Sequence, residues 1–206
     1  AGEHRFTYTD YLQWPEDERW ELIDGKAYAM APAPTISHQA LAGQLFRQID
    51  EALDGAPCRA LIAPVDVLLP ATDEADEQTA TVVQPDILVV CDPAKLTERN
   101  VRGAPDWISE VLPPATARHD HLTKRALYER AGVREYWLVH PVDRVITVYT
   151  LKDGQYGGPE IADMAGERAP TIFPEIVIRW QAILDKLPDG AAPSVETQVN
   201  SEPGPF

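Results

Sequence analysis

The sequence predicts an α/β protein in which a mixed β-sheet core is flanked by helices and preceded by an N-terminal β-hairpin. Three observations predict this class. Helical and strand-like apolar patterns alternate along the chain, in the order helix, hairpin, helix, strands, helix, strands. Hydrophobic residues make up 44% of the sequence, enough for a substantial core. The 206 residues suit one domain.

The first third of the chain predicts two helices around a hairpin. Residues 9–20 resemble a short helix interrupted at Pro15, because proline removes a helical hydrogen bond. In the stretch WELIDGKAYAM, two apolar runs flank Asp24-Gly25, a strong hairpin signal. Residues 36–53 repeat apolar side chains at helical spacing and predict a long helix.

The middle of the chain predicts three strands. Residues 59–70 read as one strand, and the acidic segment 71–80 after them reads as a flexible loop. Residues 81–91 form a second apolar run, in which Pro85 marks a strand start, an edge or a bulge. Residues 105–112 form the third run.

The last third predicts a helix over residues 117–131 that ends at Gly132. Two apolar runs, residues 134–141 and 144–151, then predict two more strands. The segment IVIRWQAILD closes the folded part. We therefore expect one domain over residues 1–185, followed by a flexible tail over residues 186–206 that is rich in proline, glycine and charge.

The net charge of −15, from 33 acidic and 18 basic residues, argues against a protein that coats nucleic acid without specificity. Contact with phosphates must then be local or mediated by a metal ion. No apolar run approaches the roughly 18 residues that cross a bilayer, and the chain starts without a signal-like stretch. We expect a cytoplasmic protein without membrane contact.

Two cysteines, Cys58 and Cys91, lie far apart in strand-like runs. Their spacing matches neither a zinc finger nor a disulfide framework. We expect both to be free thiols buried in the core, where free cysteine is common.

Two carboxylates interrupt apolar strands. Asp86 lies in QPDILVV and Glu110 lies in WISEVL. A charge inside a strand is costly unless it is paired or bound to a metal ion. Two such groups on neighbouring strands can converge on Mg²⁺ or Mn²⁺, which often take only one or two carboxylates and complete their shell with water. The alternative is that each acid pairs with an arginine or caps a turn.

The predicted helix after Glu110 adds a cation. Asp120, Lys124 and Tyr128 follow at intervals of four residues, so they share one helix face. Because this helix follows directly from the strand that carries Glu110, Lys124 can point back toward the two acids. There its ammonium group could orient a water molecule and offset charge in a transition state. The alternative is a surface ion pair between Asp120 and Lys124.

These residues occur in a longer pattern. The stretch QPDILVV…GAPDWISEVLPPATARHDHLTKRALYERAGVREYWLVHP resembles the Uma-type family of restriction-endonuclease-like proteins, part of the broad PD-(D/E)XK nuclease superfamily. The upstream WELIDGKAYAM and the helix that starts near SHQ resemble it as well. The likeness covers about residues 6–185 and implies a restriction-endonuclease-like fold.

The resemblance implies roles for particular residues. Asp86 matches the aspartate of the PD motif and Glu110 the second acid, so both are expected as metal ligands and catalytic residues. The superfamily's lysine two residues later is replaced by Leu112, and Lys124 on the next helix takes its catalytic place. Glu21 matches an acid near the metal, or is a solvent-facing strand residue.

His38 and Asp120 are expected to bind substrate, although a histidine such as His38 can also simply stabilise a helix start. One departure from the family pattern concerns the turn after Glu110. Pro113 and Ala115 replace small hydroxyl residues there, so contacts made by those hydroxyl groups are lost.

The expected function is a Mg²⁺- or Mn²⁺-dependent endonuclease that hydrolyses phosphodiester bonds of DNA. The alternative is a catalytically inactive protein on the nuclease fold that acts as a binding or regulatory module. Another hydrolase is a third possibility, but the chain lacks a GxSxG elbow, an HExxH helix and a P-loop. By analogy with nucleases that address two strands, the protein could form a homodimer.

Overall fold

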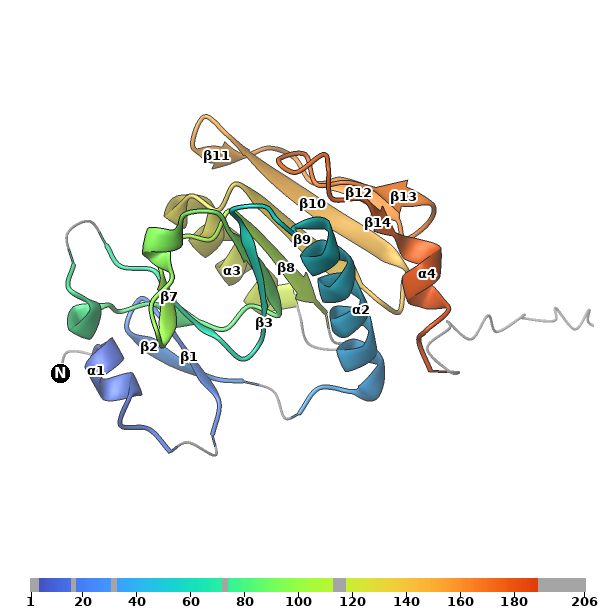
Figure 1. Cartoon of the computed structure of the whole chain (residues 1–206). Coiled ribbons are helices and arrows are strands. Elements are labelled where there is room, and N and C mark those ends of the chain that lie inside the picture. Colours follow the sequence, from blue (N-terminus) through green and yellow to red (C-terminus); the bar gives the residue numbers. More distant parts are fainter. Residues whose placement is uncertain (1–3, 16–17, 31–32, 72–73, 113–117, 189–206) are drawn as a thin grey trace, which may run out of the picture.

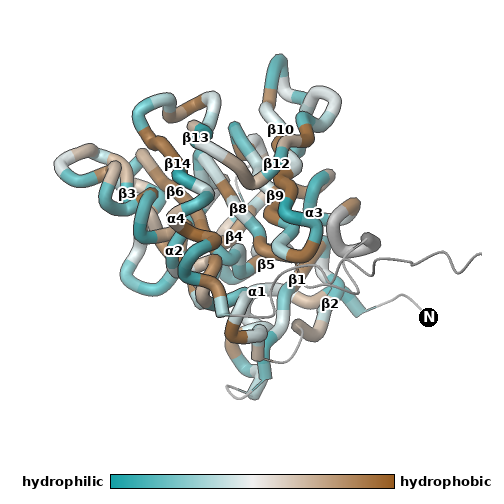
Figure 2. Tube along the Cα trace, turned by 90° about the vertical axis from the view of Figure 1, so that its right-hand side faces the viewer, coloured by the Kyte–Doolittle hydropathy of each residue, from teal (hydrophilic) through white to brown (hydrophobic). Residues whose placement is uncertain are grey.

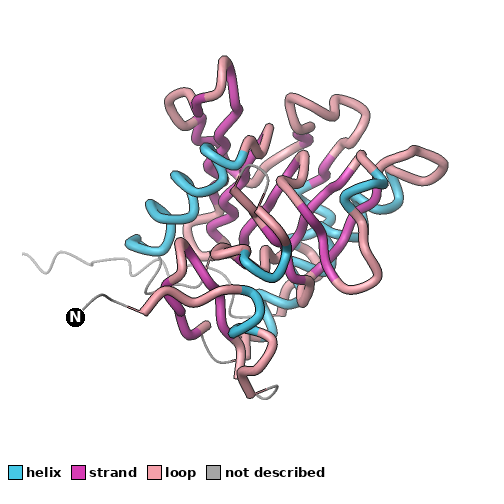
Figure 3. Tube along the Cα trace, turned by 90° about the vertical axis from the view of Figure 1, so that its left-hand side faces the viewer, coloured by secondary structure: helices cyan, strands magenta, loops and turns pink. Residues whose placement is uncertain are grey.

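The computed structural model places two main β-sheets side by side, with helices at the outside of the strands (Figures 1 and 3). It describes residues 4–15, 18–30, 33–71, 74–112 and 118–188, and only the backbone of residues 118–121. Hydrophobic residues gather in the central strands (Figure 2). No helix in these ranges is long and apolar enough to cross a bilayer.

The larger sheet has the order β11-β10-β9-β8-β6-β3, with β12 paired to β10. Strands β8 and β9 are parallel and the other neighbours are antiparallel, so the predicted mixed sheet is confirmed. The strands are β3 (Arg59–Ile62), β6 (Ile87–Val90), β8 (Trp107–Val111), β9 (Glu135–His140), β10 (Val145–Lys152), β11 (Gln155–Tyr156) and β12 (Glu160–Asp163).

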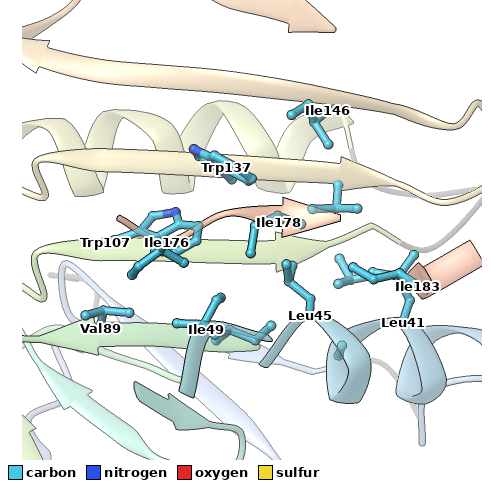
Figure 4. Close-up of a cluster of buried hydrophobic side chains, with 14 of the residues drawn as sticks. Leu41, Leu45, Ile49, Val89, Trp107, Trp137, Ile146, Ile176, Ile178 and Ile183 are labelled. Atoms are coloured by element: carbon cyan, nitrogen blue, oxygen red, sulfur yellow. The ribbon is translucent and has the colours of Figure 1, made fainter. Parts of the chain in front are cut away.

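Helix α2 (Ile36–Ala52) covers one face of this sheet. Its apolar residues Leu41, Leu45 and Ile49 are fully buried against the strands, among them the side chains of Trp107 and Trp137 (Figure 4). Burial of large apolar side chains is the main stabilising term in such a core. The short helix α4 (Trp180–Leu184) packs into the same cluster.

Helix α3 (Arg118–Ala131) covers the opposite face and lies behind the sheet in Figure 1. Leu127 and Tyr128 pack there against Ile108, Tyr136 and Leu138. Successive residues of a strand point to opposite faces, which is why Trp137 faces α2 whereas its neighbours Tyr136 and Leu138 face α3.

The smaller sheet has the order β2-β1-β5-β4-β7. Its first two strands form the predicted hairpin, and both Asp24 and Gly25 have positive φ, as the tight hairpin turn requires. The strands are β1 (Trp20–Ile23), β2 (Lys26–Ala29), β4 (Asp66–Leu68), β5 (Val82–Val83) and β7 (Asn100–Arg102). Helix α1 (Tyr8–Tyr11) packs on the face that carries Leu22 and Val82.

Two chain segments cross from one sheet to the other at the same place. The segment 59–70, expected as one strand, is divided into β3 and β4, which belong to different sheets. Pro64 lies at the break, where it cannot donate a ladder hydrogen bond. Beside it, β5 passes into β6 through Pro85 and Asp86, and Ala63 N donates to Asp86 O at 2.9 Å. Asp86 therefore lies at the junction of the sheets.

Other expectations are corrected. The helix expected over residues 9–20 is only α1, one turn long. Within the acidic segment, Asp76–Gln78 form a 3₁₀ turn. Cys58 and Cys91 are not free thiols but form a disulfide, because they flank the paired residues of β3 and β6 and so lie opposite each other. A further hairpin, β13 (Glu167–Arg168) with β14 (Ile178–Arg179), was not expected.

The proposed division into a domain over residues 1–185 and a tail over residues 186–206 stays a prediction, since residues 189–206 lie outside the described ranges.

Candidate active site

A cluster of three carboxylates lies where the two sheets meet. Glu21 comes from β1, Asp86 precedes β6 and Glu110 comes from β8. Lys124 of α3 and His38 of α2 reach the same cluster from opposite faces of the larger sheet. We call Glu21, Asp86 and Glu110 the carboxylate cluster.

The backbone holds Asp86 and Glu110 beside each other. Strands β6 and β8 are antiparallel neighbours, with Ile87 opposite Ser109. Val111 N donates to Asp86 Oδ2 at 2.8 Å, and Asp86 N faces Glu110 Oε2 at 3.3 Å. The carboxylate of Asp86 thus accepts a hydrogen bond from the residue that follows Glu110, and the carboxylate of Glu110 accepts one from the backbone of Asp86. These two hydrogen bonds fix both side chains at the junction.

Lys124 lies between the two buried glutamates. Its Nζ is 3.1 Å from Glu110 Oε1 and 2.9 Å from Glu21 Oε1. These three side chains are among the most enclosed charged groups of the protein, with 4–8% of each residue exposed. Lys124 comes close to Glu110 because α3 packs on the face of the larger sheet from which Glu110 projects.

Tyr128 is a site residue that the sequence indicated only through its helical spacing from Lys124. It lies one turn after Lys124 on α3, and its hydroxyl donates to Glu110 Oε1 at 3.0 Å. Burial raises the pKa of Tyr128 well above its ordinary value, and the neighbouring Glu110 adds to the effect. The hydroxyl therefore stays protonated and keeps Glu110 in place.

His38 approaches Asp86 from the first turn of α2. Thr35 caps this helix, because its hydroxyl accepts a hydrogen bond from His38 N at 3.2 Å. The imidazole Nε2 lies 3.2 Å from Asp86 Oδ2. Burial alone would lower the pKa of His38, but the hydrogen bond and charge of Asp86 outweigh it, and the pKa is raised.

Glu21 is buried rather than solvent-facing, which removes one of the two interpretations of this residue. Besides Lys124, its Oε1 accepts a hydrogen bond from Gln84 N at 3.0 Å. Gln84 stands directly before the Pro85-Asp86 pair, so the same short segment orients two members of the carboxylate cluster.

The cluster carries more negative than positive charge. Burial raises the pKa of Glu110 to about 7, although Lys124 acts in the opposite direction, and the charges of Asp86 and Glu21 raise it further. Three acids in one enclosed region are costly unless further positive charge is supplied. The arrangement is one that a bound cation would relieve.

The donor atoms fit a hard divalent cation held partly by water. Asp86 and Glu110 offer carboxylate oxygens, the ligand type that Mg²⁺ and Mn²⁺ favour. Within the described residues, no three His, Cys, Asp or Glu side chains are grouped into a complete metal site. Mg²⁺ commonly takes one or two carboxylates and keeps several waters in its coordination shell.

Two predicted features cannot be placed. Asp120 lies within α3, but its side chain is outside the described residues, so its expected role in substrate binding stays a prediction. The turn with Pro113 and Ala115 lies outside them as well. The catalytic and metal-binding roles of the other site residues also remain predictions, although these residues lie together.

Comparisons with known proteins agree on the kind of fold. The model of the Uma2 family, described as "putative restriction endonuclease", matches residues 8–181. A solved structure from Anabaena variabilis ATCC 29413, described as a "putative nuclease belonging to DUF820", superposes with a TM-score of 0.69. It is 20% identical, and the match covers 89% of this chain and 99% of that one. No curated protein sequence matches significantly.

Proposed function

The chain belongs to the Uma2 family, and from this membership we propose that it is a metal-dependent endonuclease that hydrolyses phosphodiester bonds of DNA. The observation that carries the proposal is the meeting of Asp86, Glu110 and Lys124 at the sheet junction. Two hard carboxylates and a buried ammonium group are the parts that phosphodiester hydrolysis needs.

Asp86 and Glu110 would hold the cation, Mg²⁺ or Mn²⁺. A divalent ion bound there supplies Lewis-acid stabilisation of the phosphate oxygens. Lys124 donates to Glu110, and its ammonium group would orient the attacking water and offset the developing negative charge. Tyr128 holds the carboxylate of Glu110 in position. Glu21 fixes the ammonium group of Lys124 from the other side. His38 orients Asp86 and would contact the substrate from the same position.

The direct test is cleavage of supercoiled plasmid and of single-stranded oligonucleotides with Mg²⁺ or Mn²⁺. We expect the wild type to cut and Asp86→Asn and Lys124→Ala to be inactive. Lys95→Ala is a matched control, because Lys95 is a half-buried lysine that donates to the backbone of Ala104, away from the cluster. Thermal melts must show that each variant is folded, since removal of Lys124 leaves two buried glutamates without their cation.

A second candidate is a binding or regulatory module without catalytic activity. It is favoured by the mutual pairing of Lys124 with Glu21 and Glu110, which could serve stability alone, and by the acidic net charge. Calorimetry separates the two. A nuclease should bind Mn²⁺, with loss of binding in Asp86→Asn but not in Asp92→Asn, whose carboxylate is exposed and only caps a short turn.

If the wild type binds no Mn²⁺ and cuts no substrate above the Lys124→Ala background, the proposed nuclease function is wrong. Dimer formation and a cytoplasmic location also remain proposals.

A further inference from the structure

One arginine is connected to the carboxylate cluster through a single residue, Gln84. Arg19 immediately precedes β1, and its Nε and Nη2 donate to Gln84 Oε1 at 3.3 and 2.9 Å. Gln84 is two residues from Asp86, and its backbone N–H donates to Glu21. One residue therefore connects the guanidinium group to two members of the cluster.

The side chain of Gln84 is oriented so that its oxygen faces Arg19. Its Nε2 donates to Asp66 Oδ1 at 2.9 Å and to the Tyr11 hydroxyl at 3.0 Å, and that hydroxyl donates to Asp66 at 2.8 Å. Burial and the charge of Asp66 raise the pKa of Tyr11, so the phenol stays a neutral donor. Because both amide donors are used on one side, the oxygen is left for the arginine, and the guanidinium group is held in place.

Arg19 keeps its charge and most of its donors available. A guanidinium group has five N–H donors, and the contacts above use two of them on an uncharged oxygen. The residue is exposed, and no carboxylate of the described residues lies within 4.0 Å of it. By contrast, seven other arginines form ion pairs with carboxylates: Arg47, Arg102, Arg125, Arg130, Arg134, Arg168 and Arg179.

We propose that Arg19 binds a backbone phosphate of DNA next to the phosphate that is cleaved. The inference rests on the proposed function and adds a contact that sets where the strand lies. A guanidinium group can bind a phosphate through two parallel hydrogen bonds, and one that is already held in position loses less conformational freedom on binding. On a chain with a net charge of −15, such a local cation offsets part of the repulsion between the protein and DNA.

The salt dependence of DNA binding tests this contact directly. Each phosphate neutralised by a protein cation contributes about −0.9 to the slope of log K against log salt concentration for duplex DNA. Binding of a fluorescein-labelled duplex is followed by anisotropy at several NaCl concentrations. Ca²⁺ is kept constant in place of Mg²⁺ to hold the site metal-loaded. The proteins are the wild type, Arg19→Gln, Arg19→Lys and Arg99→Gln.

Arg19→Gln should bind more weakly at low salt, with a slope shallower by about 0.9, whereas Arg19→Lys should keep the wild-type slope. Arg99→Gln is the matched control. Arg99 is also exposed and has no carboxylate partner among the described residues, but it precedes β7, at the opposite edge of the smaller sheet from β2. Its slope should equal that of the wild type.

A wild-type slope in Arg19→Gln, or no DNA binding by the wild type, would overturn the inference. Cleavage with Mn²⁺ is measured separately on the same proteins. If the wild type cuts DNA but Arg19→Gln has the same salt-dependence slope as the wild type, the proposed contact of Arg19 with a phosphate is wrong and the nuclease function stands. If the slope is shallower in Arg19→Gln but the wild type does not cut DNA, the contact of Arg19 with a phosphate is supported and the nuclease function is not.

Discussion

At the scale of single residues, the candidate active site is organised around the carboxylate of Glu110. Glu110 Oε1 receives the hydroxyl of Tyr128 and the ammonium of Lys124, while Glu110 Oε2 faces the backbone of Asp86. A buried carboxylate held by three donors has little freedom to rotate. Such supporting contacts often decide how well a metal ligand performs.

Tyr128→Phe should therefore reduce cleavage, because it removes one of these donors without changing the packing. Loss of a supporting partner typically costs about 10–100-fold in metal affinity or activity. The initial rate of plasmid nicking as a function of Mn²⁺ concentration measures the effect. We expect a higher metal requirement in the variant.

Tyr156→Phe controls for the loss of a buried hydroxyl. Tyr156 donates to the backbone carbonyl of Val133 at 2.9 Å, away from the carboxylate cluster. Both variants should lose about 1 kcal/mol of stability. Equal losses of cleavage in the two variants would mean that Tyr128 acts through stability alone.

A further buried acid, Glu135 at the start of β9, should make stability depend on pH. Its carboxylate accepts hydrogen bonds from Trp137 Nε1 at 2.6 Å and Ile172 N at 3.1 Å. Burial raises the pKa of Glu135 even though these hydrogen bonds act against the shift. The folded state therefore holds the proton more tightly than the unfolded state. The stabilising contribution is complete below pH about 4.5 and is lost as the pH rises through the elevated pKa.

Urea unfolding at a series of pH values from 4 to about 8 checks this expectation. The free energy of unfolding of the wild type, relative to Glu135→Gln, should fall as the pH rises through this window. A difference that stays constant or grows with pH would show that the carboxyl group is not destabilised by burial.

Much of the residue-scale site could be predicted. Asp86 and Glu110 interrupt apolar runs that became neighbouring strands, and helical spacing placed Lys124 and Tyr128 on one face. The Arg19–Gln84 contact could not be predicted, since it depends on a bend between sheets and on the orientation of an amide side chain.

At the scale of elements, hydrophobic patterns located the strands but not their sheets. The apolar run 59–70 contains both β3 and β4, which belong to different sheets and are separated by residues 63–65, with Pro64 at their centre. Strand β12 was missed for the opposite reason. It pairs with β10 and most of its residues are exposed, so no apolar alternation marks it.

The disulfide was also missed, because pairing depends on the strand register and not on sequence spacing. It joins Cys58 and Cys91 across the ends of β3 and β6, over a separation of 33 residues. Reduction should lower the free energy of unfolding by about 2–4 kcal/mol. Urea titrations with and without dithiothreitol measure the difference.

The double variant Cys58→Ser/Cys91→Ser should resemble the reduced wild type and should not respond to dithiothreitol. If dithiothreitol leaves the wild type unchanged, the two thiols are free in the purified protein.

At the scale of the whole molecule, the two sheets share one junction, and the candidate site occupies it. The predicted α/β class, the mixed sheet and the helices on both faces are confirmed (Figure 1). The second sheet was not anticipated, because an apolar run can continue through a bend from one sheet into another.

The net charge of −15 should make the fold more stable in moderate salt. Repulsion among the excess acids opposes folding, and the screening length falls from about 30 Å at 0.01 M to about 10 Å at 0.1 M salt. We expect the melting temperature to rise by a few degrees over this range, since about 1 kcal/mol shifts Tm by about 2–4 °C for a domain of this size.

Calorimetric scans without divalent ions test this. A fall in melting temperature would mean that the surface ion pairs, such as Arg102–Asp76, outweigh the general repulsion.

The shared contact of Lys124 and Tyr128 with Glu110 Oε1 also provides a rule for comparing relatives. One inserted residue between them would rotate Tyr128 by about 100° around α3 and take it away from the acid. The four-residue interval from lysine to tyrosine should thus be kept in every relative that retains this geometry. The interval from lysine to tyrosine therefore distinguishes relatives with an intact site from those that have only the fold.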